Sequence, residues 1–220
     1  MDNRYRCQQI IPLFRSEALG TVSELKFYLE TLEAFIEAER EKEISALKKE
    51  IDHRSSDDQG EFWAWHYPVH WDDIFASQIR SSFIVTLMSL VESHLGMVAE
   101  QASKIVNTRL KLRSLRERTM ALDRRFLESQ VGFTRPKKDS WKLINEIRLI
   151  RNCIVHANST IYRTDNEKSL ESLVTRLPGL SASYGVVELA REFPEHCLTV
   201  AQNFLTELYD EASTMCQRFV

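Results

Sequence analysis

Residues that interrupt helices are scarce in this chain of 220 residues, which contains only 6 Gly and 5 Pro. Proline ends or kinks a helix and glycine weakens one, so this scarcity favours long helices over many short strands. Hydrophobic residues make up 43% of the sequence and charged residues 28%, a balance that is typical of a folded globule. The sequence therefore predicts an all-α fold.

Apolar residues at helical spacing predict where the helices lie. The first helix is expected from Glu17 to about His53, and its second half is rich in Glu and Lys, which suits an exposed helix with i,i+4 ion pairs. The other helices are predicted over residues 73–103, 112–130, 141–157 and 169–176, and from Pro194 at a first helical position to about Arg218.

Polar segments predict the connections between these helices. Residues 54–60 (RSSDDQG) and residues 132–138 are expected to be loops, and residues 178–185 are expected to be a turn. Residues 186–189 are expected to form either a short strand or one arm of a hairpin. Asp72 is a candidate N-cap for the second long helix, and Asp139 or Ser140 for the 141–157 helix.

The cysteines and the apolar runs bear on where the protein resides. Cys7, Cys153, Cys197 and Cys216 are widely scattered and form no CxxC pair, so neither a disulfide framework nor a zinc ribbon is suggested. The first 15 residues lack the continuous apolar segment of a signal peptide. The longest apolar run, near residues 83–91, is far shorter than the roughly 20 residues of a membrane helix. We therefore expect a soluble cytoplasmic protein without a membrane partner.

Charge is distributed unevenly, although the net charge is only −3. Residues 104–138 contain eleven basic and three acidic residues, so this segment carries +8 and the rest of the chain −11. Such a stretch is usually the solvated face of a helix, but binding of phosphate also requires a local positive patch. The candidate RNA-binding residues are Arg113, Arg116, Arg124, Arg125, Lys137 and Lys138.

Arg151, Asn152 and His156 lie together on the predicted 141–157 helix. At about 100° per residue, Asn152 and His156 share a face, and Arg151 lies about 140° from His156. A guanidinium can hold a phosphate and offset its developing charge, and an imidazole can exchange a proton near neutral pH. These residues could cleave a phosphodiester without a metal, although an Arg and a His at this spacing also occur by chance.

Other polar residues are candidates for supporting roles around this motif. Glu92 can pair with Arg151 or Arg148, or it can be an exposed residue of the 73–103 helix. Glu146 and Arg148 are expected beside the same groove. Cys153 is interpreted as a small buried residue rather than as a nucleophile, because no second His is close in the sequence.

An aromatic cluster precedes the 73–103 helix and comprises Phe62, Trp63, Trp65, Tyr67 and Trp71. We interpret it as a packed loop or a partner-docking surface, with stacking on single-stranded RNA as the alternative. His66 and His70 have the spacing of two metal ligands on a helix. Pro68 between them disfavours a regular helix, and no third ligand is near, so no metal site is predicted.

The run IRLIRNCIVHAN resembles the signature helix of HEPN domains, a family of helical proteins named from higher eukaryotes and prokaryotes nucleotide-binding. In that family an Arg, usually followed by a polar residue, precedes a His. Arg151, Asn152 and His156 match with four intervening positions. Residues 81–95 also resemble a HEPN core helix, and residues 177–208 resemble the short β-turn and final helix of some prokaryotic members. The resemblance covers roughly residues 75–218.

The resemblance implies a HEPN-like helical bundle, to which one short β-hairpin before the last helix can belong. The long N-terminal helix and the tryptophan cluster lie outside the resemblance. Residues 1–70 would form an N-terminal helical extension with an aromatic loop, and residues 71–220 would form the HEPN-like domain within one compact unit. Such domains pair as homodimers whose motif helices face one another across a shared cleft.

The resemblance also implies metal-independent cleavage of RNA without a cofactor. His156 would act as general base on the ribose 2′-OH, as general acid toward the leaving 5′-oxygen, or as both with its symmetry mate. Arg151 would hold the scissile phosphate, and Asn152 would bind substrate or orient His156. The products would be a 2′,3′-cyclic phosphate and a 5′-hydroxyl. Such proteins are toxins or antiviral defence effectors, so an antitoxin or sensor protein is an expected partner.

Two other functions are compatible with the sequence. Many HEPN proteins bind without cutting, so the second hypothesis is a non-catalytic module that binds RNA, a nucleotide or a protein partner. The third is a helical scaffold that assembles through its N-terminal helix and tryptophans. In HEPN toxins silenced by a nucleotidyltransferase, a modified Tyr follows the His by two positions. Asn158 stands there in this chain, which argues against that mode of control.

Overall fold

The structure, a computed structural model, describes residues 3–52, 55–106 and 119–218. Its elements in chain order are α1 (Asn3–Ile51), α2 (Ser56–His66), the π-helical η1 (His70–Ala76), α3 (Ser77–Ile105), α4 (Met120–Phe126), the π-helical η3 (Leu127–Val131), α5 (Lys138–Ala157), the 3₁₀ helix η4 (Ile161–Arg163), α6 (Glu167–Arg176), β1 (Leu180–Ser183), β2 (Val186–Leu189) and α7 (Glu192–Arg218). The prediction of an all-α fold with a long N-terminal helix and a short hairpin is confirmed.

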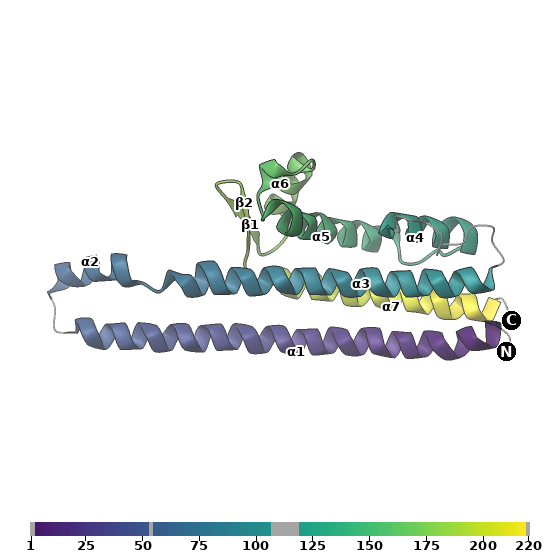
Figure 1. The fold of residues 1–220 in the computed structure, drawn as a ribbon, viewed down its shortest axis with the longest axis horizontal. Coiled ribbons are helices and arrows are strands. Elements are labelled where there is room, and N and C mark those ends of the chain that lie inside the picture. The colour runs from purple at the N-terminus through teal and green to yellow at the C-terminus, as the bar shows by residue number, and fades with distance from the viewer. Residues whose placement is uncertain (1–2, 53–54, 107–118, 219–220) are drawn as a thin grey trace.

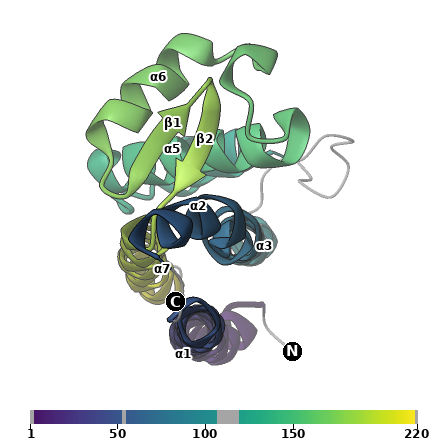
Figure 2. The same cartoon turned by 90° about the vertical axis from the view of Figure 1, so that its left-hand side faces the viewer.

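Three long helices form the body of the molecule. Helices α1, α3 and α7 run side by side, and α4, α5, α6 and the hairpin cover the side of α3 and α7 that faces away from α1 (Figure 1). The end-on view shows that α3 and α7 lie between α1 and α5 (Figure 2). The outer face of α1 and the outer face of α5 are therefore on opposite sides of the molecule.

Helix α5 places one side in the core against α3 and α7, and α6 and η4 contact other parts of it. Its buried stripe recurs every three residues, as expected for an amphipathic helix, and consists of Trp141, Ile144, Ile147, Ile150 and Cys153. These side chains pack against α3 and α7. The helix ends at Ala157, as predicted, and the next residue, Asn158, closes it in the left-handed conformation with φ of 50°. Asn152 and His156 consequently lie outside this buried stripe, and Arg151 lies beside it, where it reaches Glu92 of α3.

Carboxylates of α7 determine where α5 begins. The predicted caps, Asp139 and Ser140, do not have that role, because α5 starts at Lys138 with Lys137 as its N-cap and no capping side chain of its own. Glu207 of α7 accepts hydrogen bonds from the Lys137 amide at 2.7 Å and from the Ser140 hydroxyl at 2.9 Å. A negative charge at this end also favours the helix dipole. The register of the motif helix is thus tied to α7.

Local polar signals misled the prediction for residues 54–60. The structure has no loop at residues 56–60, because α2 begins at Ser56 and continues through Gly60. The Ser55 hydroxyl accepts a hydrogen bond from the Asp58 amide at 3.3 Å, which makes Ser55 the N-cap. The polar residues that suggested a loop are therefore the start of a helix.

Three helix starts also differ from the prediction. Helix α1 begins at Asn3 rather than Glu17 and continues through Pro12. Asp72 lies inside η1 and pairs with Arg40 at 3.1 Å instead of capping α3. Helix α7 begins two residues before Pro194. Helices α1 and α7 thus begin before the residue that the local signal indicated, whereas α3 begins at Ser77, after its predicted start at residue 73, because η1 occupies residues 70–76.

The predicted 112–130 helix is described only in its second half. Residues 112–118 lie outside the described residues, and α4 and η3 occupy residues 120–131. The Thr119 hydroxyl accepts a hydrogen bond from the Leu122 amide at 3.3 Å, so Thr119 is the N-cap of α4. A helix is therefore present over the described part of this prediction.

A disulfide joins the two ends of the chain, which the cysteine spacing did not suggest. Cys7 of α1 and Cys216 of α7 are bonded, with their Cα atoms 6.1 Å apart and a sequence separation of 209. This pairing depends on the antiparallel contact of two distant helices, so no local spacing encodes it. Disulfides are more common in oxidising compartments than in the cytoplasm, and the cytoplasmic location therefore stays a prediction.

One helical stretch is apolar enough to cross a membrane by length and composition alone. Residues Asp58–Ile105 contain a window with a mean hydropathy of 1.5, of which 33% is buried inside the molecule. The uninterrupted run near residues 83–91 therefore understates the length of this apolar stretch. A core helix of a soluble protein meets the same criterion, so the expected absence of a membrane partner stays a prediction as well.

A buried histidine links α3 to α7 and makes stability depend on pH. His94 Nδ1 and the Tyr209 hydroxyl are 2.5 Å apart in the core. Burial lowers the pKa of His94 below its ordinary value of 6.5, although the nearby Glu17 acts in the opposite direction. The unfolded chain then binds a proton more readily than the folded one, so this contribution to stability is complete above pH 6.5 and is lost as the pH falls.

We therefore expect the free energy of unfolding to fall below pH 6.5 by up to about 1.4 kcal/mol per pH unit from this group. The measurement is urea denaturation at pH 7.5 and at pH 5.5 for the wild type and for His94→Gln. The variant should lose part of this pH dependence. An identical pH dependence in both proteins would contradict the assignment to His94.

Candidate functional site

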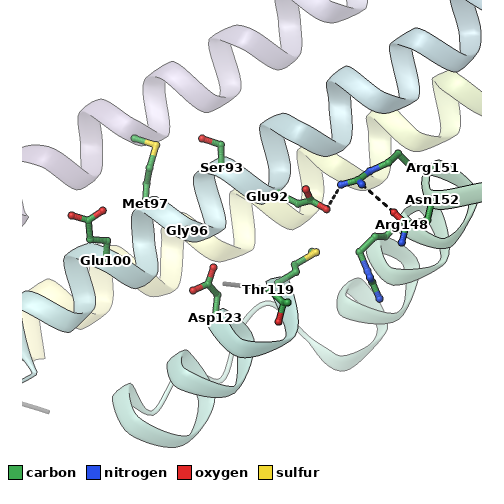
Figure 3. Close-up of a pocket in the computed structure, with 11 residues that line it drawn as sticks. Glu92, Ser93, Gly96, Met97, Glu100, Thr119, Asp123, Arg148, Arg151 and Asn152 are labelled. Carbon is green, nitrogen blue, oxygen red and sulfur yellow. Dashed lines mark hydrogen bonds and ion pairs between the residues drawn. The ribbon is translucent and has the colours of Figure 1, made fainter. Parts of the chain in front are cut away.

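A cavity of about 500 Å³ lies between α3, α4 and α5 (Figure 3). Helix α5 lines it with Arg148, Arg151 and Asn152, and α3 lines the opposite wall with residues that include Glu92. In Figure 3 the two arginines and the amide lie at one end of the cavity, and Glu100 and Asp123 lie toward the other. The cavity is therefore cationic along α5 and acidic farther away.

Arg151 is held in a fixed direction at this cavity. Its side chain is 18% exposed, and its Nη2 donates to Glu92 Oε1 at 2.5 Å. Its Nη1 donates to Asn152 Oδ1 at 3.0 Å, and both contacts are visible in Figure 3. The Nε atom is buried and has no hydrogen-bond partner among the described residues. The expected pairing of Glu92 with an arginine of the motif helix is thus present, and it leaves only the remaining Nη hydrogens for a ligand.

A second, smaller cavity of about 240 Å³ lies farther along α5. His156 and Asn152 line it from the helix, and Arg163 lines it from the segment that follows. The His156 side chain is exposed, and it has no hydrogen bond or ion pair with any part of the chain that the structure describes. An imidazole without a protein partner remains able to accept or donate a proton.

Asn152 connects the two cavities. Within one protomer Arg151 and His156 line different cavities, and Asn152 is common to both. Arg148, Asn152 and His156 follow one another at four-residue spacing, so they form a line along one face of α5 that runs from the larger cavity to the smaller one. Eight residues of helix extend about 12 Å, which is the approximate length of this line. The arrangement suits an extended anionic ligand better than a single small anion.

Glu146 does not belong to this site. It is nearly buried, and its Oε1 pairs with Arg176 Nη2 of α6 at 2.7 Å. It lines neither of the two cavities. The expectation that Glu146 lies beside the same groove as Arg148 is therefore wrong. The reason is geometric, because helical residues two positions apart differ by about 200°, which places them on opposite faces.

The candidate RNA-binding residues are only partly described. Arg113 and Arg116 lie outside the described residues. Arg124 pairs with Glu128 at 2.8 Å, and its guanidinium lies 4.9 Å from the centre of the Trp141 ring, so it has a packing role. The remaining three, Arg125, Lys137 and Lys138, are exposed and line neither cavity. Contact between this segment and RNA stays a prediction.

The aromatic cluster and the cysteine of the motif have structural contacts. The Trp71 indole donates to Glu43 at 2.7 Å, the ring of His66 stacks on Phe62 at 4.1 Å, and His70 lies 3.3 Å from Glu43. Within the described ranges, no three His, Cys, Asp or Glu side chains are grouped to hold a metal ion.

Cys153 is buried, and burial raises the pKa of its thiol, which disfavours a nucleophilic thiolate.

Sequence reasoning missed the far wall of the smaller cavity. Arg163, Thr164 and Asn166 line it, but they belong to a polar segment that carries no periodic signal.

No protein family, curated protein or solved structure matches this chain. The resemblance to HEPN domains therefore depends on the motif and its helices.

Proposed function

We propose that this protein is a metal-independent endoribonuclease. The observation that carries the proposal is the line of Arg148, Asn152 and His156 along one face of α5, with Arg151 beside it. The line combines cationic groups that bind phosphate, an amide that can donate or accept hydrogen bonds, and an imidazole that transfers protons. RNA is the substrate class because its 2′-OH supplies a nucleophile next to each phosphate.

In the proposed reaction, His156 takes the proton of the ribose 2′-OH as that oxygen attacks the adjacent phosphorus. A bond forms between the 2′-oxygen and phosphorus, the bond from phosphorus to the 5′-oxygen breaks, and the leaving 5′-oxygen receives the proton of a protonated His156, either of the same chain or of the second protomer. Arg151 offsets the charge that develops on the phosphate, and Glu92 keeps its guanidinium in one direction. The products are a 2′,3′-cyclic phosphate and a 5′-hydroxyl.

The proposal includes a homodimer, since Arg151 and His156 of one protomer border different cavities. Pairing of two α5 helices would let the arginine of one protomer and the histidine of the other act on the same phosphate. The side chain of Val155 supports such pairing, because it is apolar, 49% exposed and adjacent to His156.

Val155→Glu is therefore expected to convert the dimer to a monomer and to lower cleavage about as much as loss of His156 does. A charge buried in an apolar interface is strongly unfavourable. Light scattering gives the mass, and an RNA cleavage assay gives the activity. The matched control is Phe27→Glu, because Phe27 is 72% exposed on α1, on the opposite side of the molecule. Loss of the dimer in the Phe27 variant alone would support the scaffold hypothesis instead.

The direct test is incubation of the purified protein with total cellular RNA in the presence of EDTA. Cleavage that leaves cyclic-phosphate and 5′-hydroxyl ends would support the proposal. Intact RNA, from a protein shown to be folded and dimeric, would contradict it. If cleavage occurs, a toxin or antiviral effector that blocks translation is the proposed role, and an antitoxin or sensor is the proposed partner.

Binding without cleavage is the second candidate function. Binding without cleavage is favoured by the hydrogen bonds that Arg151 already makes, because its guanidinium donates to Glu92 and Asn152. An arginine in this state contributes less to a transition state than a free one. Saturable binding of RNA without any product in the EDTA assay would favour this candidate.

A further inference from the structure

Arg163 lines the smaller cavity and carries a positive charge, but it does not belong to the motif of Arg151, Asn152 and His156. It ends η4, and its side chain is exposed at the cavity that His156 and Asn152 also line. In the described part of the chain its guanidinium makes no hydrogen bond or ion pair. Arg163 therefore faces this cavity without a counter-ion in contact among the residues that the structure describes.

The backbone around Arg163 is anchored rather than loosely exposed. Asn158 and Ser159 both have positive φ and turn the chain back over the end of α5, where the Ser159 amide donates to the Cys153 carbonyl at 3.0 Å. The Ile161 amide then donates to the Gly185 carbonyl at 2.8 Å, and the Ile161 side chain is buried. The hairpin thus holds η4 in place beside the motif helix.

The polar groups of the cavity suit a phosphate. Asn152 Oδ1 accepts a hydrogen bond from Arg151, so its amide nitrogen remains as a donor. Arg163 can offer a planar fork of donors, which matches the oxygens of a phosphate. Asp165 also lines the cavity and reduces its positive potential. A phosphate brought against Arg163 would balance the charge of its guanidinium and could accept a hydrogen bond from the Asn152 amide.

We infer that Arg163 binds a phosphate of the RNA strand next to the phosphate that is cleaved. This inference depends on the proposed function, and it narrows the proposed substrate from RNA in general to single-stranded RNA. The strand would extend along α5 from the Arg148 end to the Arg163 end, so the substrate is single-stranded RNA that continues on the far side of His156. A separated strand can follow one helix face in this way, whereas paired strands would present two backbones.

The test uses a fluorescent 2′-O-methyl oligonucleotide, which binds but has no free 2′-OH to attack. Arg163→Ala is expected to weaken binding about tenfold at fixed salt. The slope of log K against log salt should also become shallower by about 0.7, since each phosphate contact to a single strand contributes about that amount. Arg163→Lys should retain the slope and most of the affinity, because the charge is kept.

The matched control is Arg191→Ala. Arg191 is similarly exposed, pairs with Glu195 at 3.1 Å on α7, and lines neither cavity, so its loss should change neither affinity nor slope. Equal slopes for wild type and Arg163→Ala would overturn the inference, and so would a wild type that does not bind the oligonucleotide. A shallower slope in a protein that never cleaves RNA would leave Arg163 as a phosphate-binding residue and would reject only the nuclease.

Discussion

Replacing His156 with alanine is expected to lower the rate of RNA cleavage by about 10²–10⁴-fold, which is the usual contribution of a positioned general acid or base. The expected loss is catalytic rather than structural, because the His156 side chain is exposed and makes no hydrogen bond within the described residues. Cleavage of a defined RNA with EDTA present, measured alongside the unfolding midpoint, gives the rate and the stability separately. The midpoint should be unchanged.

His66→Ala is the matched control for this prediction. His66 is an exposed histidine on α2, far from α5 along the molecule, and its replacement should leave the cleavage rate unchanged. Arg151→Lys provides a second comparison, because lysine keeps the charge but cannot hold Glu92 and a phosphate with one planar group. If His156→Ala cleaves at the wild-type rate, the proposed role of His156 is wrong, whatever the other variants do.

Replacing Arg80 with alanine is expected to lower the free energy of unfolding by about 3–5 kcal/mol, the usual cost of removing one partner of a buried ion pair. Arg80 Nε and Nη2 donate to the two carboxylate oxygens of Glu33 at 2.7 and 2.8 Å, and Nη1 donates to the Leu189 carbonyl at 3.0 Å. The Glu33 side chain is only 6% exposed. Without Arg80, this carboxylate would be buried and unpaired, and α1, α3 and β2 would lose their common contact.

Urea denaturation of three further variants separates charge burial from packing. Glu33→Gln should be destabilised, because it removes the charge that Arg80 requires. The double variant Arg80→Met/Glu33→Leu should recover much of the loss, since no buried charge remains. Lys26→Ala, which breaks an exposed pair with Glu30, should cost less than about 1 kcal/mol. A similar small cost for Arg80→Ala would show that water reaches the Glu33 carboxylate.

Periodicity was sufficient to predict the elements that bury one regular face. The apolar stripe of α5 and the end of that helix at Ala157 were both predicted, because residues three and four apart share a helix face whatever else surrounds them. The strand at residues 186–189 was anticipated as a short strand or hairpin arm, but its partner β1 lies within residues 178–185, where only a turn was expected. The placement of Asn152 and His156 outside the buried stripe follows from that spacing.

Local composition was less reliable where a polar residue has two roles. Residues 56–60 have the composition of a loop, but Ser55 uses its hydroxyl to cap a helix. Serine and aspartate favour both loops and helix starts, so only the neighbouring chain decides between them. Glu146 and Arg148 are close in sequence but face opposite ways, and the rotation of about 100° per helical residue is sufficient to predict that difference.

The amino-acid sequence by itself thus determined the helical architecture and the motif helix, because both depend on contacts within a few residues of one another. Only the tertiary structure decided that Glu92 directs Arg151, that Arg163 reaches the cavity of His156, and that Cys7 bonds to Cys216. These contacts join residues that are far apart in the chain or separated by a tight turn. They are set by how whole helices pack against one another, and no short-range spacing records that packing.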